Sequence, residues 1–257
     1  GHRLYLVGGS VRVALLGRLG HDIDCTTSAR PETVTAVLDG WADVVLDTGI
    51  EYGTISAEKN SQQIEITTFR SDVYDGQSPN PEVKFGDTLE GDLIRRDFSV
   101  NAMAVEITGD GSMVFHDPMG GLTDLAAQRL DTPNTPELSF HDDPLRMLRA
   151  ARFVSQLGFE VAPRVEEAMR DMAGEITRIT AERVQAELDK LMLGAAPWTG
   201  INLMVTTGIA DYIFPEIPGM KLTQDEHMQH KDVYAHGSGG GRARPGVALG
   251  GVIARRR

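Results

Sequence analysis

Residues 4–27 read LYLVGGSVRVALLGRLGHDIDCTT, and this stretch decides the fold. The apolar run LYLV predicts a short buried strand, and the two glycines after it predict a turn. Ser10 is expected to be the N-cap of a short helix that Gly17 ends. A second strand, DIDCTT, is expected to begin at Asp22. The opening is therefore a strand, a helix and a strand in quick succession.

Two aspartates in the second strand are the strongest candidates for chemistry. Because side chains two residues apart in a strand point to the same face, the carboxylates of Asp22 and Asp24 are expected to converge. Two adjacent anions are unfavourable unless a cation joins them. Mg²⁺ takes oxygen ligands and keeps positions for water and phosphate, so the pair suits this ion. The alternative is a solvated pair of surface acids.

The glycine turn upstream of the acids is a candidate phosphate site. Gly8, Gly9 and Ser10 lie between a strand and a helix N-terminus, where backbone N–H groups can bind phosphate. Arg12 is expected on the first turn of that helix. A plain tight turn is the alternative. A phosphate site followed by a metal-binding pair is the minimal set for transferring a nucleotide.

The rest of the N-terminal half alternates strands and short helices without a regular βαβ period. Pro31 is expected to open a helix that runs to Leu38. Further strands are expected at ADVVLD, GTISAEKN and QQIEITTF, the last two as a hairpin around Asn60 and Ser61. These features predict one compact mixed α+β domain that ends near residue 125.

From Asp142 onward the apolar residues recur with the helical period. Three amphipathic helices are expected, each opened by a polar residue or proline and closed by glycine: DPLRMLRAARFVSQLG, PRVEEAMRDMAG and TAERVQAELDKLMLG. WTGINLMVTTG and IADYIFPEIPGM continue the helical region. The sequence thus predicts an α+β domain followed by an all-helical one, with the boundary between residues 125 and 140.

The composition is that of an ordinary globular protein. The 257 residues contain 25 Lys and Arg against 37 Asp and Glu, and the net charge of −12 argues against non-specific nucleic-acid binding by the whole surface. No run approaches the ~20 apolar residues of a membrane span, and no signal peptide is recognisable, so we expect a cytoplasmic protein. The single cysteine, Cys25, excludes an internal disulfide and a cysteine-based zinc cluster.

The two ends of the chain are unusual. Because strand-like sequence starts almost at once, we expect the true N-terminus to be missing. Residues 237–257 contain seven glycines and five arginines but no acid and no aromatic residue, so they cannot build a core. We interpret them as a frameshifted or truncated end, with a flexible basic tail that touches RNA as the alternative.

Six motifs in order resemble one known family. They are LYLVGGSVRVALLG with HDIDCTT, ITTFRSDVYDG, DLIRRDFSVNAMA, HDPMGGLTDL, DDPLRMLRAARF and AERVQAELDKLM, and they cover residues 4 to about 193. They are similar to the class II nucleotidyltransferases, which comprise CCA-adding tRNA nucleotidyltransferases and bacterial poly(A) polymerases, and the whole run resembles the actinobacterial type. The resemblance implies a polymerase-β-like head followed by helices. It divides the chain into a head (1–125), a neck with a base-recognition helix (126–193), the start of a body (194–236) and the tail (237–257).

The resemblance also implies which residues hold the metal. Asp22 and Asp24 match the metal-binding aspartates of the family. Glu65, on the strand IEITTF, resembles the third carboxylate of the superfamily, with an ordinary solvent-facing strand residue as the alternative. The expected cofactor is Mg²⁺.

Nucleotide contacts are implied at several positions of the head. Gly9 and Arg12 match nucleotide-contacting positions of the first motif, and Arg96 matches a triphosphate contact. For the neighbouring polar residues the alternatives are structural: Arg95 and Asp97 as a local salt bridge, and Asn101 as a turn or cap residue. One departure stands out, because the family continues Val-Arg with an aspartate where this chain has Val13. Loss of that acid puts full activity in doubt through the placement of Arg12.

A further motif is implied to recognise the base. In the family, Asp143 and Arg146 present hydrogen-bonding groups to the base edge, with Arg149 and Arg152 nearby. A carboxylate accepts from an exocyclic amine while a guanidinium donates to ring acceptors, so the pair can recognise the amine-bearing edge shared by C and A. The alternative is a solvated arginine stripe on the helix.

The expected function is addition of C and A to the 3′ end of tRNA from CTP and ATP. Poly(A) polymerase activity is the rival within the family, and a nucleotide-binding fragment with little catalysis is the rival of another class. In similar proteins an HD-type phosphohydrolase domain follows. In this chain His236 matches only the first residue of the metal motif of that domain, so no hydrolase site is expected.

Overall fold

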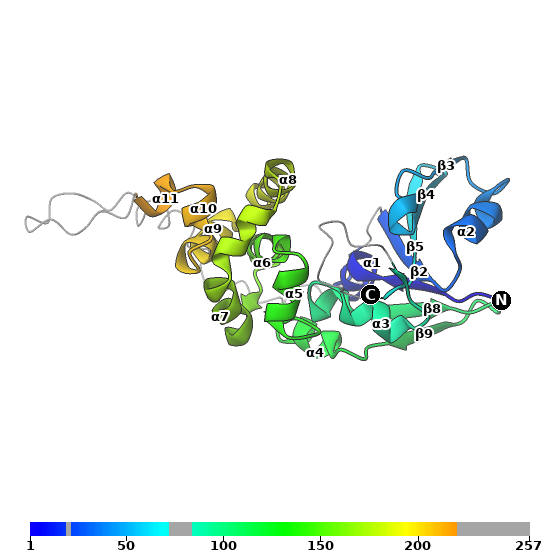
Figure 1. Cartoon of the computed structure of the whole chain (residues 1–257). Helices are drawn as coiled ribbons and strands as arrows, with labels where there is room; N and C mark the ends of the chain where they lie inside the picture. Colours follow the sequence, from blue (N-terminus) through cyan, green and yellow to red (C-terminus); the bar gives the residue numbers. More distant parts are fainter. Residues whose placement is uncertain (19–21, 72–83, 220–257) are drawn as a thin grey trace, which may run out of the picture. The chain divides into compact units, whose positions relative to one another are not determined.

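The structure is a computed structural model that describes residues 1–18, 22–71 and 84–219. The chain forms two compact units (Figure 1). One comprises residues 1–146 with 159–166, and the other comprises 147–158 with the residues from 167 onward. The expected α+β class is confirmed, because a mixed sheet with short helices precedes a run of helices.

A seven-stranded sheet forms the centre of the first unit. Its strand order is β3-β4-β5-β2-β1-β8-β9, and only the β2–β5 pair is parallel. The strands are β1 (Leu4–Val7), β2 (Asp22–Thr27), β3 (Val44–Leu46), β4 (Thr54–Lys59), β5 (Gln62–Thr68), β8 (Ala104–Ile107) and β9 (Met113–His116). Two small sheets pair β6 (Arg70–Ser71) with β7 (Lys84–Phe85), and β10 (Arg129–Leu130) with β11 (Glu160–Val161).

The strands and the helix from Pro31 to Leu38 expected from the sequence are confirmed, whereas the turn expected at Gly8 and Gly9 is helical, because α1 (Gly8–Leu15) begins there. β1, β2 and α2 (Pro31–Leu38) have the predicted starts, and β4 and β5 form the predicted hairpin. Asn60 and Ser61 both have positive φ in its turn, as a two-residue hairpin loop requires.

The two faces of the sheet carry different side chains. On one face Cys25 and Ile66 join a core with Val34 and Leu38 of α2. Because side chains alternate along a strand, the neighbours of Cys25 and Ile66 on β2 and β5 point to the opposite face. The alternation in DIDCTT therefore places apolar residues in the core and aspartates on the other face.

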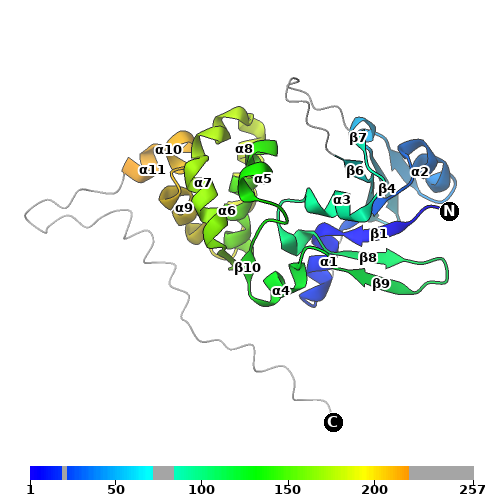
Figure 2. The same cartoon turned by 60° about the horizontal axis from the view of Figure 1, so that its bottom comes forward.

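The second face is covered in part by α3 (Leu89–Ile94). Leu89 and Leu93 of α3 pack with Tyr5 and Val7 of β1, as Figure 2 shows for the two elements. The other helices of this unit are α1 (Gly8–Leu15), α4 (Gly121–Ala126) and α5 (Pro136–Asp142), with 3-10 turns η1 (Ile50–Tyr52) and η2 (Ser99–Asn101).

The helices α6 (Leu145–Leu157) and α7 (Pro163–Asp171) lead into the second unit. It continues with η3 (Ala173–Arg178), α8 (Ala181–Met192), α9 (Pro197–Thr206), α10 (Ala210–Ile213) and α11 (Glu216–Gly219). A Cβ on Gly200 would lie 2.5 Å from the carbonyl oxygen of Ala151, so glycine lets α9 approach α6 closely. The predicted helical region is thus confirmed, while the predicted domain boundaries stay predictions.

Two expectations about the C-terminal part lie outside the described residues. These are the interpretation of residues 237–257 as an aberrant end and the match of His236 to a metal motif. In the part of the chain that the structure describes, no helix combines the length and the apolar character needed to cross a bilayer.

The packing of α3 gives a first prediction. Leu93 is 0% exposed beneath the helix, whereas its neighbour Ile94 is 39% exposed. Leu93→Ala leaves a cavity in the core and is expected to lower the free energy of unfolding by about 2–5 kcal/mol. Ile94→Ala, the matched control, should cost less than about 1 kcal/mol. Urea unfolding measures the free energy of unfolding of both variants. Equal losses in the two variants would contradict the burial of Leu93 beneath α3.

Candidate active site

Three carboxylates lie on the face of the sheet opposite α2. Asp22 and Asp24 are two residues apart on β2, and Glu65 is the Cα partner of Asp24 on the parallel strand β5. Asp22 and Glu65 are exposed, whereas Asp24 is half-buried. The structure thus brings the three predicted carboxylates to one side of the sheet, as the strand register requires.

The aspartate pair fits a cation that keeps part of its coordination shell for water and phosphate. Within residues 1–18, 22–71 and 84–219, no three acidic, histidine or cysteine side chains form a complete metal-binding group. Asp22 and Asp24 would supply two carboxylates, the small number of protein ligands that is usual for Mg²⁺ beside a phosphate substrate. A metal-binding role for Glu65 stays a prediction.

The electrostatics of Asp24 agree with a cation at this place. Burial raises the pKa of the Asp24 carboxyl above its ordinary value, and the charge of Asp22 raises it further, while Arg96 and Arg12 lower it. The charged form of Asp24 is thus disfavoured by burial, and the two arginines compensate for this only in part. A bound cation would remove the remaining repulsion.

The two glycines after β1 lie directly against this pair. A Cβ on Gly9 would lie 3.4 Å from Oδ2 of Asp24, and a Cβ on Gly8 would lie 2.9 Å from Nη1 of Arg96. Gly8 also has a φ of +63°, in the region that side chains disfavour. Glycine at position 8 therefore allows the backbone to approach the guanidinium of Arg96, while a Cβ at position 9 would make an ordinary contact with Asp24.

The expected role of Ser10 as an N-cap is wrong. Helix α1 begins at Gly8, so the two glycines belong to its first turn, and Val7 is the N-cap residue. The Ser10 hydroxyl instead accepts a hydrogen bond from the N–H of Asp24 at 2.8 Å and donates one to the carbonyl of Asp22 at 3.1 Å. Its partners come from β2, which sequence spacing alone does not reveal.

Arg12 is held by a chain of polar contacts. Its Nη1 donates to Oδ1 of Asn101, and Nδ2 of Asn101 donates to Oδ1 of Asp97 at 2.8 Å. Asn101 and Asp97 are both buried. Asn101 therefore does more than end a turn, because its amide links Arg12 to a carboxylate. This chain has Val13 where the family has an aspartate, so that acid is absent beside Arg12. The structure shows Arg12 linked through Asn101 to Asp97.

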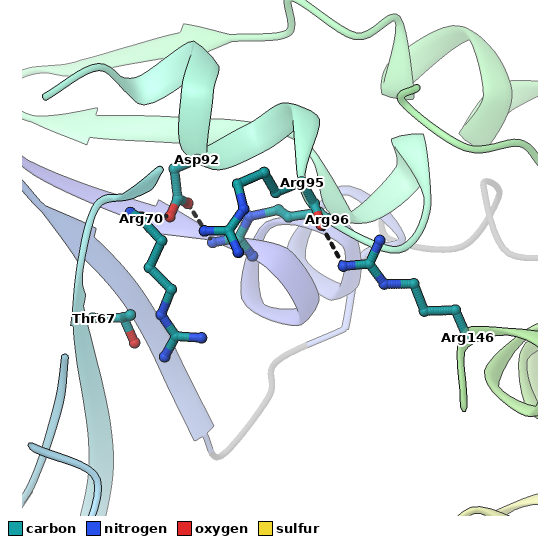
Figure 3. Close-up of a pocket in the computed structure, with 6 residues that line it drawn as sticks. All are labelled: Thr67, Arg70, Asp92, Arg95, Arg96 and Arg146. Carbon is teal, nitrogen blue, oxygen red and sulfur yellow. Dashed lines mark hydrogen bonds and ion pairs between the residues drawn. The ribbon is translucent and has the colours of Figure 1, made fainter. Parts of the chain in front are cut away.

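A cationic pocket of about 260 Å³ lies on the same unit (Figure 3). It is lined by Thr67, Arg70, Asp92, Arg95, Arg96 and Arg146. Four guanidinium groups against one carboxylate give the pocket a positive charge, which suits a polyphosphate. Of these residues the sequence predicted only Arg96 and Arg146 as nucleotide contacts.

Asp92 organises the middle of this pocket. Its Oδ2 accepts from Nη2 of Arg96 at 3.0 Å, and its Oδ1 accepts from the backbone N–H of Arg70 at 3.4 Å. Asp92 is buried, so its charge is balanced mainly by the guanidinium beside it. Arg70 and Asp92 were missed as site residues, although both stand inside motifs quoted from the sequence, ITTFR and DLIRRDF.

The predicted base-recognition pair lies where α5 passes into α6. Asp143 follows α5, and its Oδ1 accepts the N–H of Leu145 at 3.2 Å at the start of α6. Arg146 donates from Nη2 to the carbonyl of Arg95 at 2.7 Å and from Nη1 to Oγ of Ser139 at 2.8 Å. Arg146 is thus fixed at the edge of the cationic pocket, while base recognition by Asp143 and Arg146 stays a prediction.

The other two arginines of α6 belong to the second unit. Nε of Arg152 lies 3.0 Å from Oε2 of the buried Glu187 on α8, and Nη1 of Arg149 lies 3.8 Å from Oε1. The Arg152 guanidinium also stands over the ring of Phe153 at 4.4 Å. Arg152 therefore joins α6 to α8, and its predicted nucleotide contact remains untested, as does that of Arg149.

The glycine at the start of α1 gives a second prediction. Gly8→Ala is expected to displace Arg96 and to weaken binding of CTP, the ligand implied by the sequence, by about tenfold, the loss of one hydrogen bond to a charged group. Gly17→Ala is the matched control, because Gly17 also has positive φ but has no atom within 4 Å of an added Cβ. Both variants should lose roughly 1–2 kcal/mol of stability from the strained backbone. Calorimetric titration with CTP separates them, and equal CTP affinities would show that the clash does not matter.

Comparisons with known proteins identify the family of this chain. Residues 4–131 match the family model described as the poly A polymerase head domain, and residues 158–220 match the one described as the probable RNA and SrmB-binding site of polymerase A. The CCA-adding enzyme of Levilactobacillus brevis is 40% identical over 213 residues, which are 82% of this chain and 52% of that protein. That of Streptococcus pyogenes is 39% identical over 231 residues, which are 90% of this chain and 54% of that protein.

A solved structure shows the same likeness in three dimensions. The Bacillus stearothermophilus CCA-adding enzyme, solved in complex with CTP, superposes with a TM-score of 0.70 at 37% identity, over 81% of this chain and 49% of that one. The chain therefore spans about half the length of the curated relatives that it matches. With a polymerase-β-like head followed by helices, the chain belongs to the family of CCA-adding enzymes and poly(A) polymerases, as its motifs predicted.

Proposed function

We propose that this chain carries the catalytic part of a template-independent nucleotidyltransferase that adds C and A to the 3′ end of tRNA. The substrates are CTP and ATP, and pyrophosphate is released. The observation that carries the proposal is the position of Asp24 between Asp22 on its own strand and the Gly8–Gly9 backbone, with Arg96 beside it. Its relatives of known function are CCA-adding enzymes, and solved neighbours bind CTP and ATP.

The two aspartates are the groups that would hold Mg²⁺. Held by these two carboxylates, such an ion would lower the pKa of the attacking 3′-hydroxyl and would neutralise charge on the phosphates. The chain itself then has two tasks, which are to hold the triphosphate and to orient the base.

The triphosphate is assigned to the arginines around the Gly8–Gly9 backbone. Arg96 is oriented by Asp92 and lies beside Gly8, so its guanidinium is already fixed before a nucleotide binds. Arg12 is held through Asn101 in the same way. Fixed cations of this kind stabilise the charge that develops on the phosphates without reorganising during the reaction.

The base is assigned to Asp143 and Arg146. A carboxylate accepts from the exocyclic amine of C or A, and the guanidinium donates to ring acceptors, so G and U present the wrong pattern. Arg146 is anchored by Ser139 and by the carbonyl of Arg95, which keeps it beside the cationic pocket. Arg149 and Arg152 are proposed as supporting residues on the same helix.

Two alternatives follow from specific observations. The head model that matches residues 4–131 is named for poly A polymerase, so long A tracts on varied RNAs are the rival product. The chain spans about half of its relatives, so a nucleotide-binding fragment with little catalysis is the other. A cytoplasmic location remains part of the proposal, as expected for a protein that matures tRNA.

The products formed on tRNA test the proposal. The purified chain is incubated with Mg²⁺, labelled CTP or ATP, and tRNA that ends before, within or after CCA. Ordered addition of C, C and A that then stops is the expected result. Long A tracts would establish the poly(A) alternative, and nucleotide binding without incorporation would establish the fragment.

The aspartate pair gives a third prediction. Asp22→Asn and Asp24→Asn keep the shape of the side chains but remove the charges that hold the cation, so incorporation should fall to background. Asp39→Asn, at an exposed position that follows α2, is the control and should keep the parental rate. Gel analysis of labelled tRNA measures all three, and a parental rate in either site variant would refute the metal-site assignment.

A further inference from the structure

Strand β2 runs beyond its partner β1 at the end where the aspartates lie. The β1–β2 ladder pairs Leu4 with Thr27, Tyr5 with Thr26 and Leu6 with Cys25. The chain leaves the sheet after Val7, because α1 begins at Gly8. The β1 ladder therefore ends at Cys25 and does not extend over residues 22–24.

A single side chain takes the place of the missing strand. The Ser10 hydroxyl, from the first turns of α1, accepts from the N–H of Asp24 at 2.8 Å and donates to the carbonyl of Asp22 at 3.1 Å. These two groups belong to the residues before and after Ile23, and in a strand they point toward the same edge. One hydroxyl thus ties both ends of the Asp22–Ile23–Asp24 backbone to α1.

We infer that Ser10 is a positioning residue for the cation site, a role that rests on the proposed function of Asp22 and Asp24. The convergence of the two carboxylates requires extended backbone at Ile23. At one edge of β2, the parallel ladder with β5 holds residues 22–24. At the opposite edge, the Ser10 hydroxyl holds the same stretch of backbone. Ser10 therefore sets the spacing of the two carboxylates without touching the cation or the nucleotide.

The chemistry of the bridge limits which residues can replace serine. The side chain must donate and accept at the same time, which a hydroxyl does and a methyl group does not. Threonine keeps the hydroxyl. Alanine removes it and leaves the N–H of Asp24 and the carbonyl of Asp22 without this partner, at the place where a metal ligand is held.

The first measurement follows cation binding directly, without nucleotide or RNA, and a second one follows turnover. The full chain is titrated with Mn²⁺, and bound ion is followed by electron paramagnetic resonance. Ser10→Ala should weaken Mn²⁺ binding by about tenfold, the lower end of the effect of losing a partner that orients a metal ligand. Ser10→Thr should restore most of the affinity. At saturating Mn²⁺, Ser10→Ala should lower kcat more than it raises the KM for CTP.

Thr35→Ala is the matched control. The Thr35 hydroxyl also bonds a backbone carbonyl, that of Pro31 at 3.0 Å, but on α2, which packs on the other face of the sheet. Its Mn²⁺ affinity should equal that of the parent chain. If Ser10→Ala does not fold, Ser10→Cys, with a weaker donor of similar size, carries the test and should also bind Mn²⁺ more weakly.

The outcomes separate this inference from the proposed function. Parental Mn²⁺ affinity in folded Ser10→Ala or Ser10→Cys, with affinity lost in Asp22→Asn and Asp24→Asn, would overturn the role of Ser10 alone. Parental affinity in the two aspartate variants would overturn the cation site itself. Weakened binding in Ser10→Ala with rescue by Ser10→Thr would support the inference.

Discussion

The repulsion between two neighbouring carboxylates is the constraint on which the rest of the head depends. Asp22 and Asp24 share one face of β2, and burial raises the pKa of Asp24 above its ordinary value. Nearby cationic groups stabilise the charged form of such a carboxylate. Arg96 and Arg12 act in this way on Asp24, and a divalent cation bound to the pair would add to their effect.

The clustered arginines give a chain of acidic net charge a local place that suits a polyphosphate. The chain carries a net charge of −12, yet the cationic pocket collects four guanidinium groups around Asp92. That carboxylate is buried beside Arg96, so it orients the guanidinium while leaving the pocket positive. The positive charge of the pocket arises where separate segments fold onto one face of the sheet. For an anionic ligand at this place, that local charge matters more than the negative net charge of the whole chain.

The sequence was most informative where the chemistry is local. The alternation in DIDCTT predicted which residues of β2 share a face, and the order of motifs predicted the head and the helices. Ser10 was misassigned because N-capping is judged from the next few residues, whereas its true partners come from a strand twelve residues away. Arg70 and Asp92 were missed for the same reason, since only the fold brings β6 and α3 to one pocket. The pairing of Arg152 with Glu187 likewise depends on how α6 packs on α8.

The most direct test of the central claim is the anomalous scattering of Mn²⁺ in crystals of this chain grown with CTP. We predict a peak about 2.1 Å from carboxylate oxygens of both Asp22 and Asp24, the distance expected for an ion of this kind with oxygen ligands. Phosphate oxygens of the nucleotide should complete its shell. A Mn²⁺ peak on the nucleotide with neither aspartate coordinated would contradict the claim that this strand holds the catalytic metal.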